Sequence, residues 1–274
     1  MSYWLQEMKW PEVAKYLEHD DIALIPVGSV EQHGPHLPLM TDSAEAIAVV
    51  EGIMERTKVI STPPIWFGWS PHHMGYPGSV TVRPETLIGL VEDLAYSLIY
   101  HGFKKIVIVN GHRVANLPWM EIAATRIRNR TGAYVAITDV AMIAVQEIGA
   151  ILEGELGSIG HGCESETSFM LYKYPELVDM NKATKRLHEY DQKFVTSYTS
   201  MEPRIMPRNA VSVKSTPEEA RRQNGNYGHR GDPTLATADK GQQIYKAIVN
   251  NMVEFIERFV RPAQVQIRRP QVPV

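Results

Sequence analysis

An apolar run that leads into a rigid loop constrains the fold of this chain most. Ile22–Val27 is short, apolar throughout and rich in branched side chains, which favours a buried β-strand. Gly28, Gly34, Pro35 and Pro38 follow closely and disfavour a helix directly after it. The sequence therefore predicts a strand that ends in a rigid loop.

The loop carries side chains of the types that bind metal ions. Glu31 and His33 are two positions apart, so in extended backbone they point the same way. Asp42 follows far enough along for the chain to fold back toward them. Two carboxylates and an imidazole suit Zn²⁺, Mn²⁺ or Fe²⁺. The alternative interpretation is a polar surface loop.

Length and composition exclude several classes of protein. A chain of 274 residues can bury one large core, and we expect a single domain over 1–260 with a tail over 261–274. A net charge of −3 gives no electrostatic case for nucleic acid. A single cysteine excludes an internal disulfide, and no apolar run is long enough to span a bilayer. The start of the chain lacks the apolar core of a signal peptide, so we expect a cytoplasmic protein with no membrane partner.

Predicted strands alternate with predicted helices along the chain. The strands are 22–27, 58–62, 80–82, 106–109 and 133–138, and the helices are 5–18, 43–56, 84–101, 118 onward, about 140–152, 164–172 and 236–259. Alternation of this kind predicts an α/β fold with a mostly parallel sheet. The polar stretch 185–225 has little periodicity and is expected to be a long excursion.

In such sheets ligands bind at the carboxyl ends of the strands. Glu31, His33 and Asp42 follow the first strand, and His112 follows the strand that ends at Val109. We therefore expect these four side chains to converge. Taken alone, a histidine after a strand is more often structural.

Two divalent ions need about five protein ligands, and Glu166 is the best further carboxylate. Asp42, short and central in the set, is expected to bridge the ions. Zinc lowers the pKa of bound water to about 7, so a hydroxide between the ions would attack a carbonyl group. Glu164 competes for the same role, and either glutamate is also explained by the dipole at a helix start.

Other residues suggest roles around such a centre. His161 follows a glycine-rich stretch and would protonate a leaving group, unless it is a capping or surface histidine. Cys163 is expected to be a small buried thiol rather than a nucleophile. A second rigid loop offers side chains for a polar ring, namely Ser70, His72, His73 and Tyr76. Its tryptophans, Trp66 and Trp69, are better explained by core packing.

These motifs resemble those of the creatininase (creatinine amidohydrolase) family over most of the chain. The matching segments, in order, are Gly28–Asp42, Gly68–Ser79, Asn110-Gly111-His112, His161–Ser168 and Gly231–Gly241. The resemblance implies a three-layer αβα sandwich, usually assembled as a hexamer, and a two-metal hydrolase that uses zinc, manganese or iron. It implies metal ligands at Glu31, His33, Asp42 and His112. It also implies a substrate contact at Ser70, a catalytic or substrate-contacting histidine at His161 and a carboxylate at Glu166.

The chain departs from the family pattern in the third motif. Arg113 stands where a glycine is common, and Asn116 comes one place late. Val114 occupies the place where creatininase has a metal-binding glutamate, so Glu166 is our choice for the fifth ligand. Creatininase also carries a tryptophan segment where this chain has Gly157–Gly160. These differences argue against creatinine as the substrate.

Arg113 favours an anionic or oxygen-rich substrate, because a guanidinium donates several hydrogen bonds in a fixed fork; its alternative is a surface arginine. We expect a metal-dependent hydrolase that opens a small cyclic carbonyl compound, with Ser70, His73 and Arg113 as substrate contacts. The compound is either a cyclic amide, cleaved at C–N, or an oxidised cyclitol such as a diketo-inositol, cleaved at C–C as by a 3-dehydro-scyllo-inosose hydrolase. The alternatives are a non-catalytic protein that binds a metal or metabolite, and a peptidase that trims a small modified peptide.

Overall fold

The computed structural model describes residues 2–154, 159–186 and 214–271, which include a sheet of parallel strands. The strand order is β2-β1-β3-β4, with β1 at Ile22–Val27, β2 at Ile60–Ser61, β3 at Lys105–Asn110 and β4 at Tyr134–Asp139. The predicted strand 58–62 is thus shorter than expected. The predicted strand 80–82 is wrong, because Val80 makes only an isolated antiparallel bridge with Val30.

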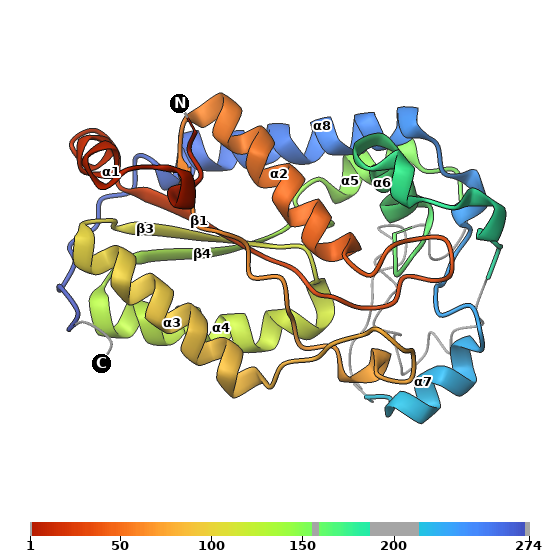
Figure 1. Ribbon diagram of the computed structural model, residues 1–274. Coiled ribbons are helices and arrows are strands. Elements are labelled where there is room, and N and C mark those ends of the chain that lie inside the picture. Colours follow the sequence, from red (N-terminus) through yellow and green to blue (C-terminus); the bar gives the residue numbers. More distant parts are fainter. Residues whose placement is uncertain (1, 155–158, 187–213, 272–274) are drawn as a thin grey trace.

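Helices cover both faces of the sheet, which gives the predicted three-layer sandwich (Figure 1). On one face lie α3 (Pro84–His101) and α4 (Arg113–Thr131). On the other lie α2 (Thr41–Thr57) and α8 (Ala238–Phe255), and both α5 (Val145–Ile151) and α6 (Glu164–Lys173) pack against α8. The remaining α-helices of the described part are α1 (Trp10–Leu17) and α7 (Pro217–Asn224). A π-helical turn, Ile256–Val260, extends α8.

The central strands are apolar throughout because both of their faces are buried. In β1, the side chains of Ala23, Ile25 and Val27 pack toward the α3–α4 layer, whereas Ile22 and Leu24 pack toward the α2–α8 layer. In β3 the residues alternate between the two cores in the same way. The continuous apolar run at 22–27 is therefore the signature of a central strand.

Several helix boundaries differ from the prediction, and one difference affects the site. Helix α2 begins at Thr41 rather than 43, so Asp42 lies in its first turn and not in the preceding loop. Helix α4 begins directly after His112 and holds Pro118 in its interior, where the missing N–H removes one backbone hydrogen bond of the helix. The expected helix 5–18 is a 3₁₀ turn, Leu5–Glu7, followed by α1, which has Pro11 in its first turn.

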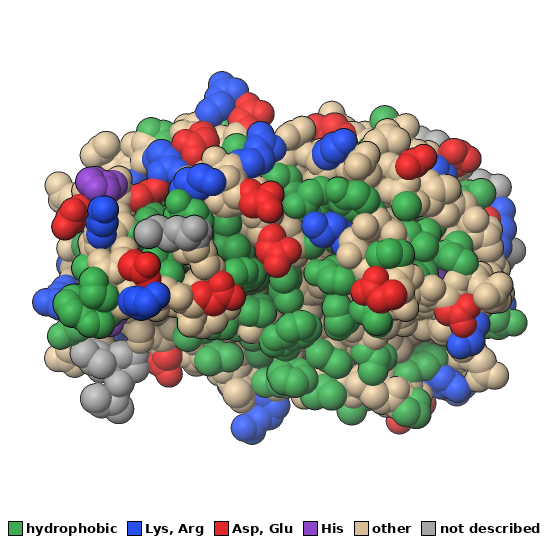
Figure 2. Space-filling view, turned by 45° about the horizontal axis from the view of Figure 1, so that its top comes forward, with side chains coloured by type: hydrophobic (Ala, Val, Ile, Leu, Met, Phe, Trp, Pro, Cys, Tyr) green, Lys and Arg blue, Asp and Glu red, His purple; other side chains and the backbone are tan. Residues whose placement is uncertain are grey.

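The two unusual segments of the sequence are partly described. Within 185–225, Thr216 and Glu219 form a capping box that starts α7, while 187–213 lie outside the described residues, as do 155–158 of the glycine-rich stretch. The tail packs along the α3–α4 layer, where Arg268 donates its backbone N–H to Thr131 and Arg269 reaches the carbonyl of Tyr100. Charges of both signs are interspersed with apolar side chains on the face drawn in Figure 2. In the described ranges, no helix combines the length and the apolar character needed to cross a membrane.

Candidate metal centre

The carboxyl ends of β1 and β3 lie side by side and bring the predicted residues together. Val27 pairs with Asn110 in the sheet, so the loop after each strand leaves from the same edge. Gly111 turns the chain into α4, and a Cβ atom there would lie 2.0 Å from the backbone oxygen of Asp42. Only glycine permits this approach, which places His112 against the first turn of α2.

His33 presents an unprotonated nitrogen to two carboxylates. Its Nδ1 lies 3.1 Å from the backbone oxygen of Glu31, which only accepts hydrogen bonds, so Nδ1 carries the proton. The Nε2 of the neutral ring is then bare, 3.1 Å from Asp42 Oδ1 and 3.7 Å from Glu166 Oε2. A lone pair facing two carboxylates is stable only with a cation or an added proton between them.

His112 presents a bare nitrogen to the other oxygen of Asp42. Ser29 donates to Glu31 Oε2, so Ser70 donates to Ser29 over 2.6 Å and accepts from His112 Nε2 over 3.3 Å. The remaining nitrogen, His112 Nδ1, lies 3.2 Å from Asp42 Oδ2. When both rings are neutral, Asp42 therefore lies between two imidazole nitrogens that have no proton to donate.

The buried oxygens at this centre lack hydrogen-bond partners of their own. Within the described residues, Asp42 Oδ2 has no hydrogen bond, Glu31 Oε1 is approached by imidazole nitrogens alone, and both carboxylates are almost fully buried. Isolated buried charges are costly, so this donor set fits divalent cations. Within the described residues, three groups have ligand atoms close enough to share an ion: Glu31, Asp42 and His112; His33, His161 and Glu166; and Glu31, His73 and His161.

The pKa values reflect the same crowding. Burial alone would raise the pKa of Glu31, but His112 and His73 outweigh it and hold that pKa well below the usual range. Burial alone would lower the pKa of His33 and His112, but neighbouring carboxylates raise both, that of His112 to about 9. Burial raises the pKa of Glu166 to about 7. Each buried carboxylate and its neighbouring imidazole thus favour the charged form of the other, and a bound cation would stabilise the carboxylates in the same way.

The two glutamates that compete in the sequence point to different places. Glu164 accepts the Lys240 ammonium over 2.6 Å and the backbone N–H groups of Glu153 and Gly154, away from the centre. Glu166 accepts the backbone N–H of Gly162 and faces His33. The geometry therefore favours Glu166 as the further ligand. The side chain of Val114 lies outside the described residues.

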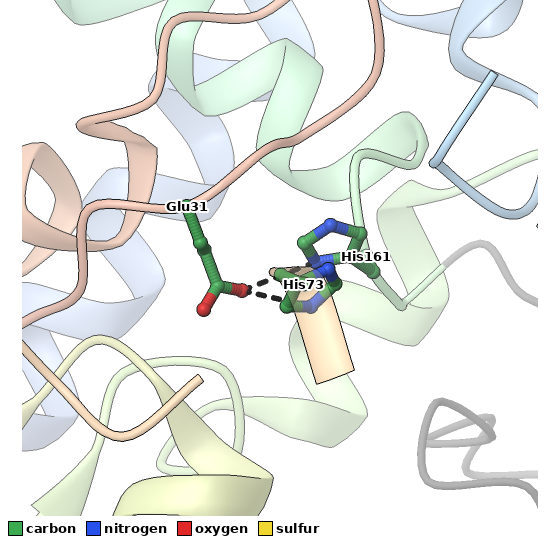
Figure 3. Close-up of side chains that lie close together, drawn as sticks. All are labelled: Glu31, His73 and His161. Carbon is green, nitrogen blue, oxygen red and sulfur yellow. Dashed lines mark ion pairs between the residues drawn. The ribbon is translucent and has the colours of Figure 1, made fainter. Parts of the chain in front are cut away.

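Two further imidazoles, those of His73 and His161, approach the Oε1 atom of Glu31 (Figure 3). His73 Nε2 lies 3.2 Å and His161 Nδ1 lies 3.6 Å from Glu31 Oε1. The two rings stack with centroids 4.3 Å apart. Burial, together with His33 and His73, lowers the pKa of His161 well below its usual value.

A cavity of about 230 Å³ opens onto the centre. Of the predicted substrate contacts, His73 and Arg113 line it, as do His161 and Trp69. Ser70 does not: it is fully buried behind His112, so its predicted place on the pocket wall is not what the structure shows. Trp66 is 40% exposed and does not belong to the core, contrary to the packing expected for it.

Arg113 extends from the first turn of α4 toward the end of β4. Its Nη1 lies 3.4 Å from Asp139 Oδ2, which has no hydrogen bond within the described residues. The other oxygen of Asp139 accepts the N–H groups of Ala141 and Met142. Burial, only partly offset by Arg113, raises the pKa of Asp139 to about 6.

Sequence reasoning missed four side chains at the site. Glu45 lines the cavity and is buried, and it lies one turn after Asp42, a spacing that could have identified it. Asp139 ends a strand at the same sheet edge, which was a second available signal. Ser29 and Gln32 act through hydrogen bonds that no sequence pattern indicates.

Comparisons with known proteins identify the family of the chain. The family model of creatininase, described as creatinine amidohydrolase, matches residues 6–256. A creatinine amidohydrolase of Pseudomonas putida is 30% identical over 198 residues, 66% of this chain and 75% of its own. A mycofactocin precursor peptide peptidase of Mycolicibacterium smegmatis is 29% identical over 246 residues, 87% of this chain and 85% of its own. A 3-dehydro-scyllo-inosose hydrolase of Thermotoga maritima is 34% identical over 110 residues, 40% of this chain and 35% of its own.

Solved structures show the same fold. The manganese form of creatininase superposes with a TM-score of 0.75 at 24% identity and covers 96% of this chain and all of its own. Fold and matched sequence thus coincide over nearly the whole chain. The relatives are hydrolases, and this chain belongs to the creatininase family.

Proposed function

We propose that the protein is a metal-dependent hydrolase that opens a small cyclic carbonyl compound. Glu31, Asp42 and His112 would hold one divalent ion, and His33, Asp42 and Glu166 a second, with zinc, manganese or iron as candidates. The observation that carries the proposal is the position of Asp42 between two bare imidazole nitrogens.

Divalent ions bound at these ligands would supply an activated water and polarise the carbonyl group. In the hydrolysis, water oxygen joins the carbonyl carbon and the bond to the leaving atom breaks. One water proton must reach the leaving atom, which is nitrogen in a cyclic amide and carbon in a 1,3-diketone. We assign the transfer of that proton to His161, and two observations support this: its ring lines the cavity and its Nδ1 faces Glu31.

The cavity supports a small substrate with hydrogen-bonding groups. At about 230 Å³ it suits a single ring, and Arg113 and His73 provide polar contacts on its wall. We propose Arg113 and His73 as substrate contacts, and Ser70 as a residue that holds His112. A cyclic amide and an oxidised cyclitol both satisfy this wall. We further propose that the protein is cytoplasmic and assembles as a homohexamer, as the family resemblance implies. Sedimentation analysis would test the number of chains in the assembly.

Metal analysis and a turnover screen test the proposal. The purified protein should hold close to two ions per chain, and lactams, formamides and diketo-inositols should be screened with added Zn²⁺ and Mn²⁺. His33→Ala or Asp42→Ala should fold but lose metal and activity. Full activity of metal-free Asp42→Ala protein would end the proposal.

A peptidase is the second candidate, because the M. smegmatis peptide peptidase matches across most of both chains. It predicts cleavage of a peptide end by the same centre, so short peptides belong in the screen. Tight metal binding without turnover of any class would favour a non-catalytic binding protein instead.

A further inference from the structure

Gln32 lies behind the two imidazoles that face Glu31, and its amide has a fixed orientation. Its Oε1 accepts the backbone N–H of Gly34 over 3.0 Å, and its Nε2 donates to the backbone oxygen of Gly228 over 3.1 Å. A backbone N–H only donates and a backbone oxygen only accepts, so the amide cannot be reversed. A Cβ atom at Gly228 would lie 1.9 Å from Gln32 Oε1, so the chain keeps room for this amide.

The amide determines which nitrogen of His73 carries the proton. One N–H of Gln32 Nε2 is used by Gly228, and the other points at His73 Nδ1 over 2.8 Å. His73 Nδ1 must therefore accept, and the proton of the neutral ring is on Nε2. That N–H is directed at the cavity side of Glu31, 3.2 Å from Oε1.

The backbone of the same residue determines the opposite arrangement in His161. The backbone oxygen of Gln32 lies 2.5 Å from His161 Nε2 and can only accept, so this nitrogen carries the proton. Gln32 Nε2 also lies 2.9 Å from His161 Nε2, and we assign the His161 proton to the shorter contact with the backbone oxygen, which can only accept. His161 Nδ1 is then bare, and it faces the same oxygen of Glu31.

We propose that Gln32 is a positioning residue that sets His73 and His161 in complementary tautomers, one donor and one acceptor, on the same side of Glu31. The inference rests on the proposed hydrolase function. His73 presents its N–H to Glu31 Oε1 at the cavity wall, and His161 presents a bare nitrogen that takes up and returns the water proton.

The assignment also restricts where metal binds. The ligand atoms of Glu31, His73 and His161 lie close enough to hold an ion. An Nε2 that carries a proton cannot be a ligand, so this group is not a third metal site. Ions should contact His33 and His112 and leave His73 unchanged.

Nitrogen-15 NMR of the imidazole rings tests this on zinc-loaded, ring-labelled protein, with each signal assigned by a single His→Gln variant. Wild-type His73 should show protonated Nε2 and unprotonated Nδ1, before and after zinc is added. His161 should show protonated Nε2. The signals of His33 Nε2 and His112 Nδ1 should shift on zinc binding.

Gln32→Glu replaces the donor toward His73 with an acceptor at almost the same shape. His73 should change to the Nδ1–H tautomer, whereas His161 should keep its proton on Nε2, because the backbone oxygen is unchanged. We expect kcat to fall about tenfold or more, with KM changed less than about threefold. Gln32→Met should lower kcat without imposing the reversed tautomer.

Gln242→Glu makes the same chemical change on the exposed side of α8 and should leave both spectra and kinetics unchanged. A zinc-shifted His73 Nε2, or wild-type His73 with its proton on Nδ1, overturns the inference even if no variant folds. Unshifted His33 and His112 signals overturn the proposed metal centre instead. The two failures are therefore distinguishable in one titration.

Discussion

Glu164 and Glu166 lie two residues apart in the first turn of α6, but their side chains have different partners. Glu164 has a complete set of partners, the Lys240 ammonium and two backbone N–H groups. Among the described residues, Glu166 accepts the backbone N–H of Gly162 and otherwise faces the His33 imidazole. A buried group with complete partners supports the fold, whereas one with incomplete partners is available for chemistry.

The largest expected effects separate these two glutamates directly. Glu166→Gln should weaken zinc binding by at least about 100-fold and lower turnover accordingly, because it removes a charged ligand. Its unfolding free energy without metal should stay within about 1 kcal/mol of wild type, since burial already raises the pKa of Glu166 to about 7. Calorimetric zinc titration and chemical denaturation measure both.

Glu164→Gln should show the reverse pattern. It leaves the buried Lys240 ammonium without its nearest carboxylate and should cost about 3 kcal/mol of stability, with zinc affinity retained. If Glu164→Gln loses zinc and Glu166→Gln keeps it, the contrast between the two is wrong.

Asp139 is intermediate, since one of its oxygens accepts two backbone N–H groups and the other has only the Arg113 guanidinium nearby, 3.4 Å away, among the described residues. Its folded pKa of about 6 exceeds its ordinary value of 3.8, so the folded state binds the proton more tightly. This carboxyl therefore reduces stability as pH rises from about 4 to 6.

Asp139→Asn removes this pH-dependent loss of stability, because an amide does not titrate in this range. The variant should gain stability relative to wild type between pH 4 and 7, by up to about 3 kcal/mol. Urea denaturation across this range measures the difference, and a constant difference would show that the Asp139 carboxyl does not titrate there.

Substitution of Arg113, the residue that faces Asp139, tests whether this arginine contacts substrate. Arg113→Gln should raise KM for an oxygen-rich substrate about tenfold, or about 1.4 kcal/mol, with kcat little changed. Arg222→Gln, an exposed arginine of α7, is the matched control. Equal KM values for both variants would remove Arg113 from the substrate site.

Cys163, like Glu164, is a buried residue that supports the fold, and its substitution should have the smallest effect on activity. Its side chain is fully buried, its sulfur accepts the N–H of Gly160, and burial raises its pKa well above the usual value. Cys163→Ala should keep activity within about twofold of wild type. Loss of turnover at unchanged stability would make the thiol part of the chemistry.

The sheet and the metal-type residues were predictable because their signals are local. Ile22–Val27 is apolar on both faces, and Glu31, His33 and His112 follow strands that end at one edge. Asp42 was identified, although its place in the first turn of α2 was not, because prolines and glycines before it obscure the helix start. The orientation of Gln32 and the burial of Ser70 depend on contacts between segments far apart in sequence. The sequence pattern of a single segment therefore predicts neither the orientation of Gln32 nor the burial of Ser70.

Asn116 links the segments that form the metal centre. It donates to the Gly28 carbonyl and accepts from the Trp69 backbone N–H and the Trp119 indole. One amide thus fastens the three segments that supply Glu31, Ser70 and His112. The conformational entropy of arranging them is lost when the chain folds, so an incoming ion would meet a preorganised cage.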